Sequence, residues 1–293
     1  MRALIAALQK LHKAPEGQAS GSQFTPAQRK ELDAFIQQTH ALSCITSGRG
    51  VLYRTLQREV LEQHLRSLSP SYFDSQRDSL PDRASNIGQY RDSKGGRAKH
   101  NTYYLLMKAV GKKVLWKNSV HDLDLSESSN RYGVGTIEIN PEDSWQSAHP
   151  LWLVENQALF DRIDWLPEGT DASIHWYRGH LNTNLLDWLS AKERAPKVIL
   201  FPDYDGVGLQ NFTRLHQLLG NQCELWLMPN WETKLQRYGS NEIWLNTRSD
   251  FDVAAAYLQE LLQEDTEQGR GIKALIHTLR TNGLALEQEA VWL

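Results

Sequence analysis

Two aspartates carry the clearest chemical signal in this chain. Asp203 and Asp205 directly follow the apolar run Val-Ile-Leu-Phe, which is typical of a strand buried on both faces of a parallel sheet. Side chains at i and i+2 of an extended chain point to the same side, so both carboxylates are expected to leave the carboxyl end of that strand together. Paired carboxylates at such an edge suit a divalent cation.

Glycines follow the aspartates at once. Gly206 and Gly208 are predicted to let the backbone turn sharply and let a phosphate approach, and a helix is expected over 207–219. An Asp-x-Asp pair at a strand end is also the first motif of haloacid-dehalogenase-type phosphatases. It occurs in receiver-type and purely structural turns as well. The pair alone therefore does not define a function.

Two further apolar runs lie upstream. Residues 150–156 end in Glu155-Asn156, and residues 172–179 end in Gly179. The predicted order is strand-Glu, helix, strand-Gly, helix, strand-Asp-x-Asp, helix, strand. Glu155 could complete a second metal position or act as a general acid or base. Three clustered carboxylates repel one another, so without a cation at least one pKa should be raised.

Over residues 145–231 this order resembles the Toprim domain, the metal-dependent catalytic module of topoisomerases, primases and several nucleases. The resemblance implies an α/β fold with a parallel, Rossmann-like sheet and Mg²⁺ as cofactor, with Mn²⁺ as the alternative ion. It assigns metal binding to Asp203 and Asp205, and an acid/base or metal-binding role to Glu155. Asn156 and Gly179 match the family pattern and are expected to shape the site. The alternative is a purely structural role, with Asn156 as a helix cap and Gly179 as a turn residue.

Composition sets the limits of the interpretation. The chain has 293 residues, enough for two or three domains, and its formal net charge of −3 gives no global indication of nucleic acid. Cys44 and Cys223 lack the spacing of a zinc site, which favours a reducing compartment. Neither a signal peptide nor a membrane span is recognisable, so a cytoplasmic protein without membrane association is expected.

Residues 1–68 are predicted to form an α+β, winged-helix-like domain of short helices and one hairpin. Thr25 and Gln28 form a capping box at the start of one helix. Arg49, near the tip of the hairpin, and Arg54 are candidate DNA contacts. The alternative is a small dimerisation module with ordinary surface arginines.

Residues 69–144 are predicted to be a linking or arm region. Its segment 83–117 contains nine Lys and Arg residues, one acid and interleaved aromatic residues, a composition suited to a polyanion. The alternative is a solvated helix face. Acidic residues follow at 121–143; they are expected to face solvent, with Glu138 or Asp143 joining the metal site as the less favoured option. The predicted DNA contacts of the arm are Arg91, Lys94, Arg97 and Lys99.

The order of winged helix, arm and Toprim domain (145–293, with C-terminal helices) resembles the topoisomerase VI A subunit and, more closely, the JetD-like nuclease subunit of Wadjet plasmid-defence systems. Tyr53 lies in the hairpin and is interpreted as a core residue, which favours hydrolysis over transesterification. We therefore expect a magnesium-dependent DNA endonuclease that forms a homodimer and works with an SMC-like ATPase complex in antiplasmid defence.

Two other functions stay open at this point. A haloacid-dehalogenase-like phosphatase would use Asp203 as nucleophile and Asp205 as acid/base. A winged-helix regulator would bind DNA without metal and cleave nothing. The former predicts an aspartyl-phosphate, and the latter predicts sequence-specific binding.

Overall fold

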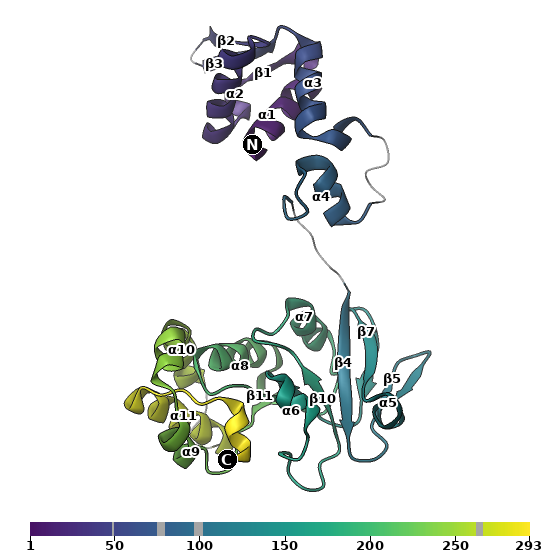
Figure 1. Ribbon diagram of the computed structural model, residues 1–293, viewed down its shortest axis with the longest axis vertical. Coiled ribbons are helices and arrows are strands. Elements are labelled where there is room, and N and C mark those ends of the chain that lie inside the picture. The colour runs from purple at the N-terminus through teal and green to yellow at the C-terminus, as the bar shows by residue number, and fades with distance from the viewer. Residues whose placement is uncertain (49, 75–79, 97–101, 262–265) are drawn as a thin grey trace. The chain divides into compact units, whose positions relative to one another are not determined.

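The computed structural model describes residues 1–48, 50–74, 80–96, 102–261 and 266–293, and the chain divides into two compact units, Met1–His100 and Asn101–Leu293 (Figure 1). Three predicted DNA contacts, Arg49, Arg97 and Lys99, lie outside the described residues. Each unit has its own hydrophobic core. In the described ranges, no helix combines the length and apolar character that crossing a bilayer requires.

The first unit combines helices with a small antiparallel sheet in the order β1-β3-β2. Its strands are β1 Gln18–Ser20, β2 Leu42–Ser47 and β3 Gly50–Thr55. Its helices are α1 Arg2–Lys13, α2 Pro26–Thr39, α3 Arg58–Leu68 and α4 Asp82–Tyr90, with short 3-10 turns at Pro15–Gly17, Gly21–Gln23 and Pro70–Phe73.

Local signals of the sequence are confirmed in this unit. The Thr25 hydroxyl accepts a hydrogen bond from the Gln28 N–H at 3.2 Å, and the Gln28 side chain accepts one from the Thr25 N–H at 3.0 Å. The capping box therefore starts α2 as predicted. Tyr53 is buried and donates to Asp33 at 2.9 Å, which confirms it as a core residue.

The second unit is built on a mixed six-stranded sheet in the order β12-β11-β9-β10-β4-β7. The first four strands are mutually parallel, and β4 and β7 are antiparallel to their neighbours. Their bounds are β4 Tyr103–Val110, β7 Gly135–Ile139, β9 Leu151–Val154, β10 Ala172–Trp176, β11 Val198–Phe201 and β12 Cys223–Leu225.

The parallel strands end at one common edge. Val154 at the end of β9 is paired with Phe201 of β11 on one side and with Trp176 of β10 on the other. All four residues of β9 are buried, as expected for a strand covered on both faces. The residues that follow these strands are therefore brought together, as the sequence predicts.

The expected arm region is divided between the two units. The units separate at residue 100, and β4 and β7, which come from residues 69–144, belong to the main sheet. The cause is visible in β7, whose residues alternate between buried and exposed positions and so give the sheet an apolar face. A second small sheet has the order β6-β5-β8, with β5 Leu115–Lys117, β6 Asp122–Asp124 and β8 Gln146–Ser147.

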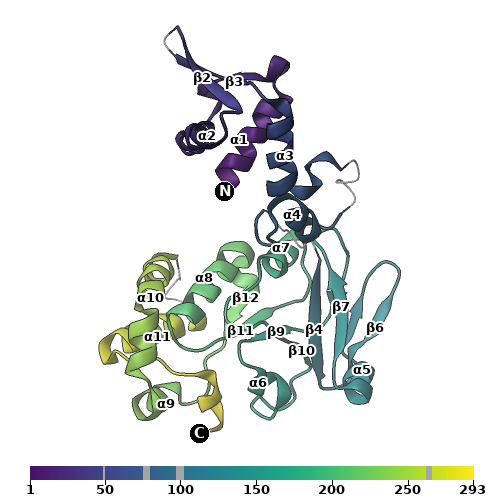
Figure 2. The same ribbon diagram turned by 45° about the horizontal axis from the view of Figure 1, so that its top comes forward.

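Helices surround the sheet of the second unit. Figure 2 shows α8, α10 and α11 beside the β11–β12 end of the sheet and α5 beside its β4–β7 end. The bounds are α5 Leu125–Tyr132, α6 Gln157–Asp161, α7 Thr183–Ala191, α8 Gly206–Leu219, α9 Trp231–Tyr238, α10 Asn241–Leu261 and α11 Glu267–Asn282, with 3-10 helices at Gly220–Gln222 and Gln288–Trp292.

Candidate functional site

Carboxylates converge where β9 and β11 end. Glu155 follows β9 directly, and its Oε2 accepts a 3.4 Å hydrogen bond from the backbone N–H of Asp203. Asp205 is the N-cap of α8, and its Oδ1 accepts a 2.8 Å hydrogen bond from the Gly208 N–H. The strand ends thus bring together Glu155 and Asp203, which lie 48 residues apart in the sequence.

The electrostatics of this cluster favour bound protons. Burial and then the charges of Asp203 and Asp205 raise the pKa of Glu155 to about 8. Burial, opposed by the Gln288 backbone hydrogen bond and assisted by neighbouring acids, raises the pKa of Asp203 to about 7. Burial also raises the pKa of Asp205. The metal-free cluster therefore retains a proton near neutral pH, as repulsion between carboxylates requires.

The donor atoms have the chemistry of a magnesium site. Carboxylate oxygens are the protein ligands that Mg²⁺ prefers, and one or two suffice because water and phosphate complete the shell. In the part of the chain that the structure describes, however, no group of three or more His, Cys, Asp or Glu residues is arranged to hold a metal ion. The donor atoms of Asp203 and Asp205 are of the type that binds Mg²⁺. They do not belong to a preformed group of three ligands in the described residues.

Tyr177 and Asn156 fix the orientation of the acids. The Tyr177 hydroxyl donates to Glu155 Oε2 at 3.2 Å, and the Asn156 side-chain amide donates to Asp203 Oδ1 at 3.3 Å. The same amide donates to Glu289 at 3.0 Å. Asn156 precedes α6, but its side chain makes no capping hydrogen bond there. The amide acts on the carboxylates instead.

Gln288 is the site residue that sequence reasoning missed. Its backbone N–H donates to Asp203 Oδ1 at 2.8 Å. Its side chain accepts from the Asn156 N–H and donates to the Phe201 carbonyl, both at 3.2 Å. This fully buried amide links the ends of β9 and β11. Backbone hydrogen bonds between Tyr204 and Leu286 bring the C-terminal segment to this position. A single Gln near the C-terminus carries no recognisable motif.

The glycines next to the aspartates serve packing. A Cβ on Gly206 would lie 1.9 Å from the Thr247 carbonyl of α10, and a Cβ on Gly208 would lie 2.0 Å from the Asp203 carbonyl. Neither has a positive φ, in contrast to Gly179, whose φ is +60°. Gly206 and Gly208 are thus required for close backbone contact, which the prediction of a sharp turn overlooks.

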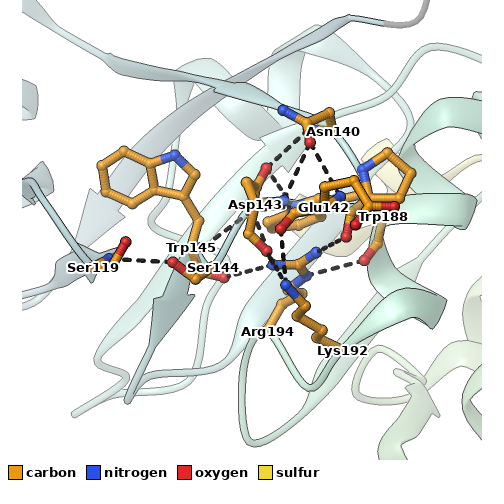
Figure 3. Close-up of polar contacts among 10 residues, drawn as sticks. Ser119, Asn140, Glu142, Asp143, Ser144, Trp145, Trp188, Lys192 and Arg194 are labelled. Carbon is orange, nitrogen blue, oxygen red and sulfur yellow. Dashed lines mark hydrogen bonds and ion pairs between the residues drawn. The ribbon is translucent and has the colours of Figure 1, made fainter.

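The acidic segment contributes a separate, structural cluster. Asp143 accepts hydrogen bonds from Trp188, Asn140 and Trp145 and pairs with the guanidinium of Arg194 at 2.9 Å (Figure 3). Arg194 also donates to backbone carbonyls of residues 141, 143 and 145. These contacts hold the loop before β8 against α7. Asp143 therefore serves in a structural ion pair, and Glu138 is exposed on β7.

The predicted DNA contacts within the described residues are surface side chains of the first unit. Arg54 is exposed on β3, and Arg91 and Lys94 are exposed around the end of α4. A turn fixes this segment, because the Asp92 carboxylate accepts a 2.9 Å hydrogen bond from the Lys94 N–H. The carboxylates belong to the second unit.

The second unit is thus a mixed-sheet α/β unit with an acidic cluster at the carboxyl ends of parallel strands. The chain belongs to the family described as Domain of unknown function (DUF7281), whose model matches residues 132–292, more than half of the chain. The matched range contains Glu155, both aspartates and Gln288. A search of curated proteins found no match.

Proposed function

We propose that the protein is a Mg²⁺-dependent DNA endonuclease, with Mn²⁺ as the alternative ion, whose second unit has the Toprim arrangement. The observation that carries the proposal is the contact of Glu155 with Asp203 at the ends of adjacent parallel strands, with Asp205 two residues further on. The strand-Glu, strand-Gly, strand-Asp-x-Asp order along β9, β10 and β11 supports the Toprim assignment.

The chemistry is hydrolysis of a phosphodiester: water adds to phosphorus and one P–O ester bond breaks. Asp203 and Asp205 would hold the ion, which supplies charge stabilisation at the phosphoryl oxygens and a bound water of lowered pKa. Glu155 would act as the general acid that gives a proton to the leaving oxygen. Tyr177, Asn156 and Gln288 hold these carboxylates in place.

The larger assignment rests on the resemblance described above. The helices and hairpin of the first unit support a winged helix that binds DNA, and exposed Arg54, Arg91 and Lys94 supply positive charge for phosphates. A homodimer in the cytoplasm, acting with an SMC-like ATPase as the JetD-like cutting subunit of an antiplasmid complex, is the proposed biological form.

Nicking of supercoiled plasmid tests the proposal. Wild type should cut with Mg²⁺ and not with a chelator, and Glu155→Gln and Asp203→Asn should each lower the rate by at least about 100-fold. Asp187→Asn, an exposed acid of α7, is the matched control and should keep full activity.

Mg²⁺ binding measured by calorimetry gives a second readout when a partner protein controls access to DNA. Asp203→Asn should abolish the binding heat, and Asp187→Asn should preserve it. Equal nicking by wild type, Glu155→Gln and Asp203→Asn would contradict the site. Hydrolysis of small phosphomonoesters through an aspartyl-phosphate at Asp203 would favour the phosphatase instead.

A further inference from the structure

One face of the sheet presents aromatic rings beside cations. Tyr104 on β4 is 65% exposed. The Arg178 guanidinium lies 4.1 Å from the ring centre of Trp176, which is half-buried at the end of β10. Such pairs of a cation and an aromatic ring are common where proteins bind nucleic acid strands.

Register places these side chains on the same face. Lys108 of β4 is paired with Ile174 of β10 in antiparallel fashion. Side chains alternate along a strand, so Leu106 and Tyr104 lie on the same face of β4 as Lys108, and Trp176, the last residue of β10, lies on the same face as Ile174. Directly opposed residues of an antiparallel pair point to the same side. Tyr104 and Trp176 therefore share one face of the sheet, and the Arg178 guanidinium on the Trp176 ring adds a cation to that face. These three residues are named here the Tyr104–Arg178 strip.

The backbone of Arg178 is held in an unusual conformation. Its φ is +60°, in the left-handed region that disfavours a non-glycine residue, and Gly179 has the same φ. The fully buried Asn211 of α8 fixes this turn, because its amide donates to the Gly179 carbonyl at 2.6 Å and accepts from the Leu181 N–H at 3.1 Å. The turn thus presents Arg178 in one fixed position.

Arg178 is adjacent in sequence to a residue of the candidate site. It follows Tyr177, whose hydroxyl donates to Glu155. Within the described ranges Arg178 has no ion-pair partner, and its side chain is exposed. A planar guanidinium that stacks on a ring and keeps its N–H donors free is suited to bind phosphate.

We propose that the Tyr104–Arg178 strip binds a single strand of nucleic acid beside the carboxylates, with a phosphate on Arg178 and an unpaired base stacked on Tyr104. Its position next to a cleavage site rests on the proposed function. An unpaired base is required because both faces of a paired base are already stacked. Glu138 lies opposite Tyr104 on β7 and repels phosphates, so the backbone of the strand runs on the β10 side.

Binding of a short labelled single strand to the full chain, measured by fluorescence anisotropy without metal, tests the inference. Arg178→Ala should weaken binding about tenfold and reduce the slope of log K against log salt by about 0.7. Arg178→Lys should keep that slope. Tyr104→Ala should weaken binding about tenfold, while Tyr104→Phe should bind as wild type does. A duplex of the same sequence should show none of these differences.

An exposed pair elsewhere in the same unit supplies the controls. Arg131 lies 5.3 Å from the ring centre of Tyr132 on α5, and Tyr132 is 70% exposed. Helix α5 lies at the other end of β4 from Tyr104, because the Ser129 hydroxyl of α5 accepts a 2.8 Å hydrogen bond from the Ala109 N–H. Figure 1 shows α5 beside the sheet. Arg131→Ala and Tyr132→Ala should leave the affinity for the strand unchanged.

The outcomes separate the two proposals. Unchanged affinity and slope in Arg178→Ala and Tyr104→Ala, in a wild type that cuts DNA, would overturn this inference alone. Losses of equal size with duplex DNA would overturn it too. Strand binding that depends on Arg178 in a protein that neither cuts DNA nor binds Mg²⁺ would support the strip and contradict the nuclease. A wild type that binds neither the strand nor Mg²⁺ and does not cut would overturn both.

Discussion

The backbone N–H of Gln288 donates a 2.8 Å hydrogen bond to Oδ1 of Asp203, across 85 residues of sequence. The side chain of the same residue satisfies the Asn156 N–H and the Phe201 carbonyl. The acidic edge of the sheet is therefore completed by a segment that is remote in sequence from the strands that carry the acids.

Gln288→Ala should destabilise the second unit. The substitution leaves one buried N–H and one buried C=O without a partner, at about 1–3 kcal/mol each. We expect a loss of about 2–4 kcal/mol in urea unfolding, together with reduced nicking. Gln268→Ala, which removes one hydrogen bond to the Cys223 carbonyl, is the milder control. Equal losses in the two variants would show that Gln288 has no special role.

Glu155 predicts a pH-dependent stability in the absence of metal. Its pKa is raised from 4.5 to about 8 in the folded protein, so the folded state binds the proton more tightly than the unfolded state. Its stabilisation is complete below about pH 4.5 and is lost as the pH rises through 8. Glu155→Gln should lie within about 1 kcal/mol of wild type at pH 5 and exceed it at pH 8.5 by on the order of 4 kcal/mol. Chelator-treated protein unfolded in urea at both pH values tests this, and a constant difference would contradict it.

Magnesium should act on stability through the same cluster. An ion that binds only the folded state at 100 times its Kd adds about 2.7 kcal/mol. Wild type should therefore unfold at a higher temperature with Mg²⁺, by roughly 5–10 °C for a unit of this size. Asp203→Asn should show no such shift in differential scanning fluorimetry, and a shift of equal size there would remove Asp203 from the metal site.

The pair Arg194–Asp143 should contribute strongly to the stability of the second unit. Arg194 is 1% exposed, and Arg194→Met leaves the Asp143 carboxylate buried without its cation, a change that costs about 3–5 kcal/mol. Lys117→Ala breaks the exposed pair with Asp122 and should cost less than about 1 kcal/mol. Urea unfolding compares the two. A small effect of Arg194→Met would mean that the cluster in Figure 3 contributes little.

The stability of Gly206→Ala tests whether Gly206 is needed for close packing rather than for its backbone conformation. The new methyl group would collide with backbone atoms of α10, so we expect a loss of about 2–3 kcal/mol. Gly133 at the end of α5 has a left-handed backbone with a φ of +86° and open space around it, so Gly133→Ala should cost only about 1 kcal/mol of backbone strain. Thermal unfolding gives both values, and the reverse order would contradict the packing role.

The features that the sequence predicted correctly are those set by residues close together in the chain. The runs before Glu155 and Asp203 became β9 and β11 because uninterrupted apolar residues suit strands covered on both faces. The capping box at Thr25 fixed the start of α2 through contacts three residues apart. The meeting of Glu155 with Asp203 followed from the rule that parallel strands share an edge.

Contacts between distant segments were not predictable in this way. Strand β4 lies within the segment 83–117, which is interpreted as basic and aromatic, and the sequence does not indicate that this strand pairs with β10 and β7. Gln288 lies 132 residues from Asn156, and it contributes to the site only because the fold brings the two residues together. Tyr204, between the aspartates, is buried because its hydroxyl binds backbone groups of residues 226 and 228.

The link from Asn156 to Gln288 also orders events during synthesis. At about 5–20 residues per second, a ribosome needs roughly 7–26 s to add the 132 residues between them. β11 ends 87 residues before Gln288, so for that part of the interval both strands exist without the amide that joins their ends. The acidic edge is therefore assembled late, after the strands that carry its carboxylates have left the ribosome.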